Sequence, residues 1–268
     1  MFWVCFNSFV AQDRVIVVII IAGPCVIESE DCVMQIASAL KQISANIGHE
    51  IIFKASFDKA NRSSHSSYRG LGVERGLEIL KEVKEKYSIR TLTDIHLPQQ
   101  AALASKSVDI LQIPAFLCRQ TDILSAAAST RCIVNVKKGQ FMSPEDMVNV
   151  VNKLKHYQAG KIWLTERGTT FGYNRLVVDY TGIPVMQETG CPVIFDATHS
   201  VQRPGGMGTS SGGNREFVEP LAKAAAAVGV DGFFFETHPN PDRALSDGPN
   251  MVPLKEFEGM LTRVLSKS

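Results

Sequence analysis

The sequence lacks any segment typical of a membrane or secreted protein. An apolar run near the N-terminus, Val15 to Ala22, has eight residues, whereas a membrane-spanning helix needs about 20. No basic region precedes the first apolar segment, Phe2 to Val10, as it would in a signal peptide. We therefore expect no membrane partner and a cytoplasmic location.

An excess of charge of one sign is also missing. The 268 residues contain 28 Lys and Arg against 27 Asp and Glu, and the formal net charge is +1. A dedicated nucleic-acid-binding protein would show a basic excess, so we expect no nucleic-acid partner. A balanced total still permits a local basic pocket.

Cysteines and linkers are scarce. Six cysteines are too few for a disulfide scaffold, and none occurs in a CxxC pair, which argues against a zinc ribbon or a thioredoxin motif. No Pro- or Ser-rich linker divides the chain, and the apolar fraction of 45% is enough for a large core. The sequence predicts one domain over residues 1–268, in which residues 1–15 are an extension of unknown role.

Eight apolar, β-branched runs alternate with segments of helical periodicity, at the spacing of strand–helix units. The predicted strands are Val15–Gly23, Ile51–Phe57, Arg90–Ile95, Ile110–Pro114, Cys132–Val136, Lys161–Thr165, Pro192–Phe195 and Asp231–Phe235. The predicted helices are Asp31–Ile47, Gly72–Tyr87, Gln120–Ser129, Pro144–Lys155 and Arg215–Val228, with a weak one near Thr181–Thr189. Eight such units favour an α/β fold, a single (β/α)8 TIM barrel; the alternative is an open doubly wound sheet.

Polar or ionisable residues follow nearly every predicted strand. They include Cys25, Lys54, Asp94, His96, Gln112, Lys137, Lys138, Glu166, Arg167, Asp196, His199, Glu236 and His238. In a barrel, the C-terminal ends of all strands lie on one face. The sequence therefore predicts one shared site at that face.

Several of the expected site residues are cations: Lys54, Lys59, Lys137, Lys138 and Arg167. One lysine alone could reach solvent or pair with a carboxylate. A buried set of cations is unfavourable unless anions occupy the site, so together they indicate a phosphate- or carboxylate-bearing ligand. The polar run from residue 59 to 64 is suited to wrap a phosphate. The glycine-rich loop from residue 203 to 213 lacks the GK[ST] of a P-loop, and we interpret it as an anion-binding loop or a mobile lid.

Four potential metal ligands follow strands that would be neighbours in a closed barrel: Cys25, His199, Glu236 and Asp247. A mixed sulfur, nitrogen and oxygen set suits Zn²⁺, Fe²⁺ or a similar divalent ion. Alternatively, Cys25 is a small buried residue and His199 a hydrogen-bonded core histidine. His96 and His238 could replace one of the ligands or act in acid–base chemistry.

Eight segments carry a family signature: IAGPCVIES (21–29), FDKANRSS (57–64), TDIH (93–96), QIPAFLCRQTD (112–122), NVKKGQF (135–141), LTERGTTFGYN (164–174), FDATHSVQ (195–202) and ETHPNPDRALSDGP (236–249). In number, order and length they resemble the 3-deoxy-D-manno-octulosonate 8-phosphate synthase family of lipopolysaccharide biosynthesis. The resemblance runs from about residue 16 to the end. KANRSS differs from the KPR(T/S) of the sister synthases that make 3-deoxy-D-arabino-heptulosonate 7-phosphate.

The resemblance implies that phosphoenolpyruvate condenses with D-arabinose 5-phosphate and water to give the eight-carbon keto-sugar acid phosphate and inorganic phosphate. It implies catalytic roles for Lys59, Lys137, His199 and Asp247. Substrate contacts are implied for Lys59, Lys137, Arg167, Ala115 and Phe116 around phosphoenolpyruvate, and for Asn61, Arg62, Ser63, Ser211, Lys54 and Asp94 around the sugar phosphate. Gln112 is implied as a further substrate contact, without a choice between the two substrates. Family members are typically homotetramers, in which Arg62 reaches a neighbouring subunit's site.

The family has metal-dependent and metal-independent forms, and the latter have Asn where this chain has Cys25. The resemblance therefore implies the metal-dependent form, in which Cys25, His199, Glu236 and Asp247 hold Zn²⁺, Fe²⁺, Mn²⁺ or a similar ion. Two features depart from that form. SDGPN (246–250) is similar to metal-independent members, and Ala55 stands where relatives often have Ser, so one sugar contact would be lost.

In the implied reaction, C3 of phosphoenolpyruvate attacks the sugar aldehyde, water adds at C2, and phosphate leaves by C–O cleavage. The ion could polarise the aldehyde, orient it or activate the water, and His199 could relay a proton. Three alternatives remain open: the seven-carbon sister synthase, a metal-dependent aldolase on the same barrel, and a sugar-phosphate-binding barrel without turnover.

Overall fold

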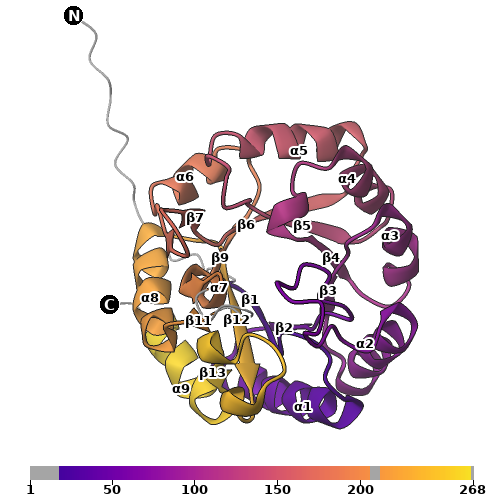
Figure 1. Cartoon of the computed structure of the whole chain (residues 1–268), viewed down its shortest axis with the longest axis vertical. Helices are drawn as coiled ribbons and strands as arrows, with labels where there is room; N and C mark the ends of the chain where they lie inside the picture. The colour runs from indigo at the N-terminus through magenta and orange to yellow at the C-terminus, as the bar shows by residue number, and fades with distance from the viewer. Residues whose placement is uncertain (1–17, 206–211, 267–268) are drawn as a thin grey trace, which may run out of the picture.

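The computed structural model describes residues 18–205 and 212–266. Eight parallel strands surround one axis: β1 Ile19–Gly23, β2 Ile51–Lys54, β3 Thr91–Asp94, β4 Ile110–Ile113, β5 Ile133–Lys137, β6 Lys161–Glu166, β9 Val193–Asp196 and β12 Gly232–His238. They pair in this order, and β12 pairs back onto β1 to close the ring (Figure 1). The predicted α/β, (β/α)8 TIM barrel is confirmed, and the open sheet is excluded.

Helices surround the ring of strands (Figure 1). They are α1 Glu30–Ile47, α2 Val73–Tyr87, α3 Pro98–Ala104, α4 Thr121–Ala128, α5 Met147–His156, α6 Gly182–Gln187, α8 Val218–Val228 and α9 Leu254–Leu265. A single turn, α7 Ala197–Ser200, follows β9 directly. Periodicity predicted six of the outer helices and missed α3 and α9. None of the helices within residues 18–205 and 212–266 is both long enough and apolar enough to span a bilayer.

The start of α5 differs from the prediction. We expected Ser143 to cap a helix beginning at Pro144, but the helix begins at Met147. The Ser143 hydroxyl accepts a hydrogen bond from the Asp146 amide at 3.3 Å and so caps the turn that leads into the helix. In α1, by contrast, Ser29 caps the first turn by accepting from the Cys32 amide at 3.2 Å.

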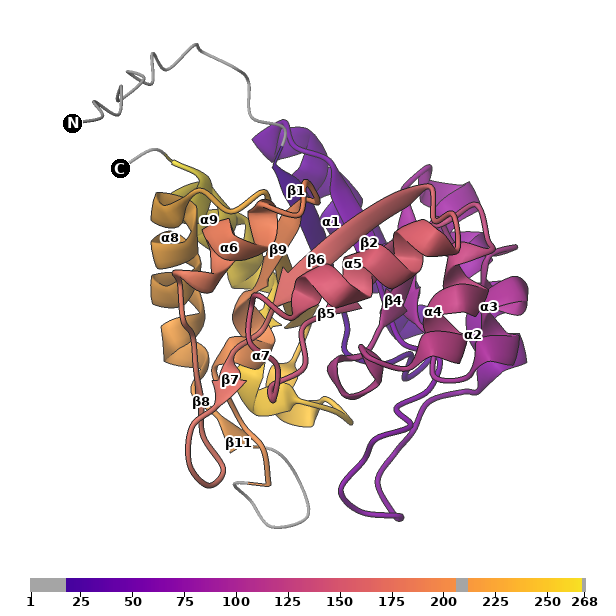
Figure 2. The same ribbon diagram turned by 90° about the horizontal axis from the view of Figure 1, so that it is seen from above.

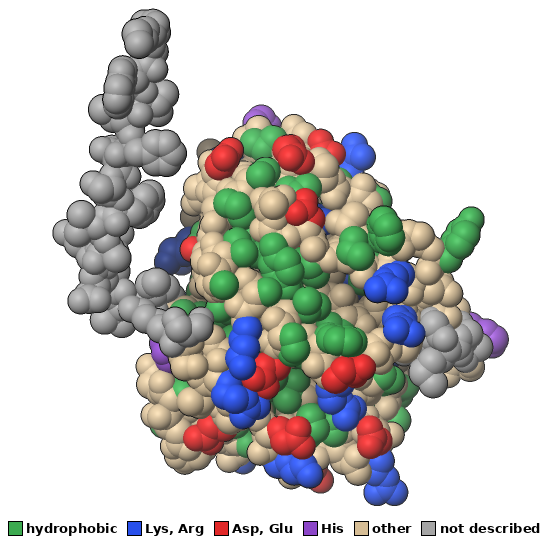
Figure 3. Space-filling model, turned by 90° about the vertical axis from the view of Figure 1, so that its left-hand side faces the viewer, with side chains coloured by type: hydrophobic (Ala, Val, Ile, Leu, Met, Phe, Trp, Pro, Cys, Tyr) green, Lys and Arg blue, Asp and Glu red, His purple; other side chains and the backbone are tan. Residues whose placement is uncertain are grey.

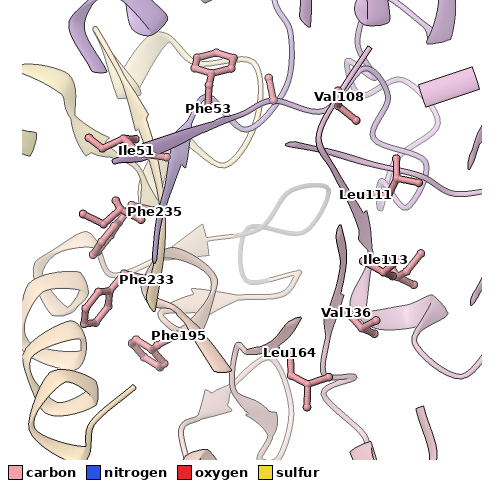
Figure 4. Packing of buried hydrophobic residues seen from close by; sticks show 14 of the residues in the cluster. Ile51, Phe53, Val108, Leu111, Ile113, Val136, Leu164, Phe195, Phe233 and Phe235 are labelled. Atoms are coloured by element: carbon pink, nitrogen blue, oxygen red, sulfur yellow. The ribbon is translucent and has the colours of Figure 1, made fainter. Parts of the chain in front are cut away.

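The strands bury side chains on both faces, as parallel strands covered by helices do. Outward-pointing side chains form the core between barrel and helices, where Figure 4 shows Phe53, Leu111, Val136, Phe195 and Phe235. The inward-pointing side chains form a second cluster inside the barrel: Ile21, Ile52, Leu92, Ile110, Trp163, Ile194 and Phe234. The barrel is therefore a packed support for the face above it.

Short elements extend the loops that follow the strands. They are β7 Thr169–Thr170 and β8 Leu176–Val177, β10 Gln202–Arg203 and β11 Gly212–Gly213, β13 Val252–Pro253, and the 3₁₀ turns η1 Ala115–Leu117, η2 Arg215–Phe217, η3 Pro241–Arg243 and η4 Gly248–Asn250. Figure 2 shows β7, β8 and β11 projecting from the same end of the barrel as the loop between β2 and α2. The predicted extension of residues 1–15 lies outside the described residues.

Candidate active site

A cavity of 690 Å³ opens at the C-terminal face of the barrel. Eleven of the predicted site residues line it: Lys59, Asn61, Arg62, Ser63, Asp94, Ala115, Phe116, Lys137, Arg167, His199 and Asp247. Four others are almost fully buried and do not line the cavity, namely Cys25, Lys54, Gln112 and Glu236. Ser211 lies outside the described residues. The barrel has thus brought residues from all along the chain to one site.

The ends of β1 and β2 approach each other closely. A Cβ atom on Gly23 would lie 2.0 Å from the Lys54 carbonyl oxygen, so only glycine fits there. This approach places the Lys54 ammonium beneath the site. It donates to the Cys25 carbonyl at 2.9 Å and lies 3.2 Å from Glu236 Oε1. One buried cation therefore ties together β1, β2 and β12.

Three predicted metal ligands converge beside this lysine. The Cys25 Sγ atom and one oxygen each of Glu236 and Asp247 all lie within 4.8 Å of one another. The Cys25 thiol donates to Asp247 Oδ2 at 3.1 Å and lies 2.8 Å from the Ser246 hydroxyl. Among the described residues, the buried Glu236 Oε2 has no hydrogen-bond partner. An orphaned carboxylate oxygen beside a thiol and a second carboxylate fits a divalent cation.

Charges around these ligands set their protonation. Burial, together with the charge of Glu236, raises the pKa of the Cys25 thiol well above its usual range. Burial acts in the same direction on Glu236, but His199, Lys54 and Lys59 outweigh it and lower the pKa of that carboxyl. A cation at the cluster would stabilise the thiolate, as divalent ions do with coordinating thiols.

The fourth predicted ligand, His199, lies at the edge of this cluster. Its Nε2 atom is 3.5 Å from Glu236 Oε1. Its Nδ1 atom lies 2.8 Å from Asp196 Oδ2, and the Asp196 carboxylate also accepts the His199 amide at the start of α7. The Asp196 carboxylate occupies Nδ1, so Nε2 is the ring nitrogen that faces the cluster and that a metal ion would take, as in many metal-binding histidines.

Two cations occupy the wall above His199. The Lys137 ammonium lies 2.6 Å from Asp196 Oδ2 and 3.9 Å from the centre of the Phe234 ring. Arg167 donates to the His199 carbonyl at 3.3 Å and to Gln202 Oε1 at 3.0 Å. Burial lowers the pKa of both cations despite the neighbouring carboxylates. A bound anion would relieve this cost, which supports an anion-binding wall.

Another cation of the cavity lining, Lys59, faces Asp94 with 4.0 Å between Nζ and Oδ2. Burial alone would lower the pKa of Lys59, but the surrounding acidic groups raise it above its usual range. For Asp94, burial is outweighed by the charges of Lys54, Lys59 and Lys137, so the pKa of this carboxyl is lowered. Both groups are therefore charged at neutral pH.

Asp94 is held by a chain of hydrogen bonds across the barrel. Thr165 donates to Asn135 Oδ1 at 2.8 Å, and Asn135 donates to Gln112 Oε1 at 3.0 Å. Gln112 and Ser56 then donate to the two oxygens of Asp94. Gln112, which we expected to contact substrate, lies below the cavity and orients Asp94 instead of lining the wall.

The loop between β2 and α2 carries Asn61, Arg62 and Ser63 into the cavity wall. Arg62 donates to the Tyr68 carbonyl at 3.1 Å and to the Leu245 carbonyl at 3.5 Å. These bonds fasten the loop to the segment that carries Asp247. Its exposed polar groups are free to meet a phosphate at the open side of the cavity.

The structure places three further residues that the sequence analysis singled out. Lys138, expected at the mouth, is buried outside the cavity wall and lies 3.5 Å from Glu166 Oε2. It directly follows the last residue of β5, Lys137, and successive residues of an extended chain point to opposite sides. Ala55 packs in the core between barrel and helices and does not line the cavity. His96 lines the cavity against Phe57 and lies outside the metal cluster formed by the described residues.

Sequence patterns missed several residues of the site. Ser246 contacts Cys25, and Gln202 joins Arg167 to Asp247 Oδ1, to which it donates at 3.0 Å. Gln202 is the last residue of the segment FDATHSVQ (195–202), and Ser246 directly precedes the predicted ligand Asp247. Both residues are polar and lie beside predicted site residues, which could have marked them as candidates. The sequence does not show which side chains they contact.

Comparisons with known proteins identify the family of the chain. A sequence model of the DAHP synthetase I family matches residues 11–266. A protein of Rhodopseudomonas palustris (strain TIE-1), named 2-dehydro-3-deoxyphosphooctonate aldolase, is 58% identical over 92% of this chain and 86% of its own. Proteins of the same name are 58% identical in Synechococcus sp. (91% of this chain, 86% of the relative) and 57% identical in Bradyrhizobium diazoefficiens (92% and 88%).

Proposed function

Because the chain belongs to the DAHP synthetase I family and is 57–58% identical to relatives named 2-dehydro-3-deoxyphosphooctonate aldolase, we propose that it makes 3-deoxy-D-manno-octulosonate 8-phosphate. Phosphoenolpyruvate condenses with D-arabinose 5-phosphate and water, and inorganic phosphate is released. One geometric observation carries the proposal: a single cavity is lined both by the buried cations Lys137 and Arg167 and by the polar loop residues 61–63. Two anionic substrates fit such a lining.

Lys59, Lys137 and Arg167 bind the phosphate and carboxylate of phosphoenolpyruvate. Arg167 suits a bidentate contact with a planar or tetrahedral anion, whereas the two lysines act as point charges. Asp196 fixes the Lys137 ammonium from below, so the cation is placed before substrate arrives. Preorganised cations stabilise the negative charge that develops as phosphate leaves C2.

At the open end, Asn61, Arg62 and Ser63 bind the phosphate of the sugar. Asp94 and Lys54 lie deeper, towards the aldehyde. This orientation directs C1 of the sugar towards C3 of phosphoenolpyruvate. Exposed Phe116 on η1 and buried Ala115 cover the phosphoenolpyruvate side and help to exclude water from it.

Cys25, His199, Glu236 and Asp247 would hold a divalent ion such as Zn²⁺, Fe²⁺ or Mn²⁺. When bound, such an ion supplies Lewis-acid chemistry at the aldehyde end of the cavity. His199 remains oriented by Asp196, and Lys54 balances the negative charge of Glu236 from below.

We also propose a cytoplasmic homotetramer. Figure 3 shows hydrophobic side chains gathered in the middle of one face, with charged side chains around them. The helix α8 lies on that side of the barrel in Figure 1 and exposes Val228, and the preceding Phe217 is 51% exposed. Such an area suits contact with another copy of the chain.

Phosphate release from phosphoenolpyruvate tests the proposal, with arabinose 5-phosphate and erythrose 4-phosphate supplied in parallel. We expect release with the five-carbon sugar only, and strong loss of it in Lys137→Met. Lys81→Met, on the exposed face of α2, is the matched control and should retain activity. Faster release with erythrose 4-phosphate would overturn the proposal in favour of the seven-carbon synthase, which the family description names. No release with either sugar would remove both.

A further inference from the structure

A second group of potential metal ligands lies outside the cavity. It consists of Glu28, which follows β1, Cys32 in the first turn of α1, and His238 at the end of β12. His238 Nε2 lies 3.5 Å from Cys32 Sγ and 3.6 Å from Glu28 Oε2. All three donor atoms lie within 4.8 Å of one another. The group shares no residue with the cluster of Cys25, Glu236 and Asp247.

The two distances from His238 Nε2 match a tetrahedral ion. Ligands that bind zinc at about 2.0–2.3 Å in tetrahedral geometry lie roughly 3.3–3.6 Å apart. One thiolate, one imidazole and one carboxylate leave the fourth position for water, and the combination suits Zn²⁺. The side chains of Glu28 and His238 are 13% and 8% exposed, and Cys32 is partly exposed. An ion can therefore enter from solvent without passing through the cavity.

The surrounding structure holds two of the three ligands in place. The Leu245 amide donates to Glu28 Oε1 at 2.8 Å, which leaves Oε2 facing the group. Ser29 caps α1 through the Cys32 amide and so fixes the backbone that carries the thiol. The Asn240 amide donates to His238 Nδ1 at 3.0 Å, which places the ring proton on Nε2. When an ion binds Nε2, the ring proton moves to Nδ1, and the hydrogen bond from Asn240 is given up.

We propose that Glu28, Cys32 and His238 form a second divalent-metal site of the zinc class, with a structural role. Leu245 directly precedes Ser246 and Asp247, and its carbonyl accepts from Arg62. An ion held by Glu28 therefore fastens α1 and β12 to the segment that carries Asp247. The site stiffens one edge of the cavity without contacting substrate.

Titration of the metal-free, full-length chain with Co²⁺ tests this site directly. Cobalt bound to a thiolate gives a charge-transfer absorption band that carboxylate and imidazole ligands do not give. In Cys25→Ser, the cavity cluster has lost its thiolate, so any remaining band comes from another cysteine, and its loss on removal of Cys32 assigns it to that residue. We expect one thiolate-bound cobalt per chain in Cys25→Ser and no band in the Cys25→Ser, Cys32→Ser double variant.

Glu28→Gln and Glu30→Gln form a matched pair in the Cys25→Ser background, because Glu30 pairs with Arg75 on the surface and lies outside the group. Glu28→Gln should weaken cobalt binding at least about tenfold, and Glu30→Gln should leave it unchanged. Zn²⁺ should also raise the melting temperature of Cys25→Ser and not that of the double variant.

A folded Cys25→Ser protein without a cobalt–thiolate band would overturn the proposal, as would a band that persists in the double variant. Circular dichroism verifies folding in each case. These measurements need no substrate, so their outcome is independent of whether the chain makes the eight-carbon product.

Discussion

Asp196 holds Lys137 by a contact of 2.6 Å between Oδ2 and Nζ, in a position where both side chains are buried. The same carboxylate lies 2.8 Å from His199 Nδ1. One side chain thus places a cation of the anion-binding wall and sets the tautomer of a histidine at the metal cluster. The two halves of the site share a single anchor.

Asp196→Asn removes this anchor and should damage both halves. An amide cannot balance Lys137, and an uncompensated buried charge costs about 3–5 kcal/mol of stability. Loss of the histidine tautomer and of the lysine position should lower kcat by roughly 10²–10⁴-fold in protein that remains folded. Urea unfolding and steady-state kinetics measure the two effects.

The control is Asp58→Asn, which breaks the ion pair with Arg69, an exposed side chain. Exposed pairs contribute about 1 kcal/mol or less, so this variant should keep nearly full stability and activity. Equal losses in both variants would show that Asp196 has no special role.

Gly23→Ala tests the close approach of β1 to β2. The added methyl group would lie 2.0 Å from the Lys54 carbonyl oxygen, and backbone cannot move away as a flexible side chain can. We expect a loss of about 1–3 kcal/mol or more in unfolding free energy, with a lower kcat because Lys54 shifts. Gly160→Ala has open space and no positive φ, so it should be nearly neutral. Unchanged stability in Gly23→Ala would mean that the two strand ends lie further apart.

Cys25→Asn should lower the divalent-metal content by one equivalent per chain while the barrel stays folded. The asparagine oxygen is a poorer ligand than a thiolate, so less metal should bind. The barrel should stay folded because Cys25 belongs to neither of the two hydrophobic core clusters. Metal analysis by mass spectrometry, combined with thermal unfolding, measures both properties, and some activity is expected to remain. Complete loss of folding with unchanged metal content would contradict the assignment of Cys25 as a ligand.

Stability should fall as the pH drops. Burial raises the pKa of Asp94 and Asp196, but Lys54 and Lys59 around Asp94, and His199 and Lys137 around Asp196, outweigh it and lower both values. The folded protein then binds fewer protons than the unfolded chain, so these groups contribute stability above about pH 4 that is lost as the pH falls further. Urea unfolding at about pH 7, 5 and 3.5 should show a decreasing free energy, most steeply in the last step. A free energy that rises on acidification would contradict the charge assignment.

The sequence predicted the barrel well because each strand is an apolar, β-branched run set between helices. The helix α3 has only seven residues. Detection of a helix from hydrophobic periodicity needs a longer segment, so the sequence analysis missed it. Lys138 was wrongly assigned to the mouth because its side chain follows the strand alternation and turns away from Lys137. Both lysines are simply cations in the sequence. The structure shows that the side chain of Lys137 lines the cavity and that of Lys138 does not.

The members of the site were largely predictable, but their partners were not. The position of Cys25 follows from the end of a strand in a closed barrel, and that of Asp247 from the loop after the eighth strand. The contact of Ser246 with Cys25, and the chain from Thr165 to Asp94, depend on side-chain directions across several strands. Sequence spacing carries no information on such distances, so the anchor role of Asp196 emerges only from the structure.

The most direct test of the central claim is the mass of the product formed from phosphoenolpyruvate and arabinose 5-phosphate. The account predicts an eight-carbon 3-deoxy keto-sugar acid phosphate, formed in equal amount to the inorganic phosphate released. Phosphate release accompanied only by pyruvate and unchanged sugar would contradict it, because the cavity would then hydrolyse its substrate without forming a carbon–carbon bond.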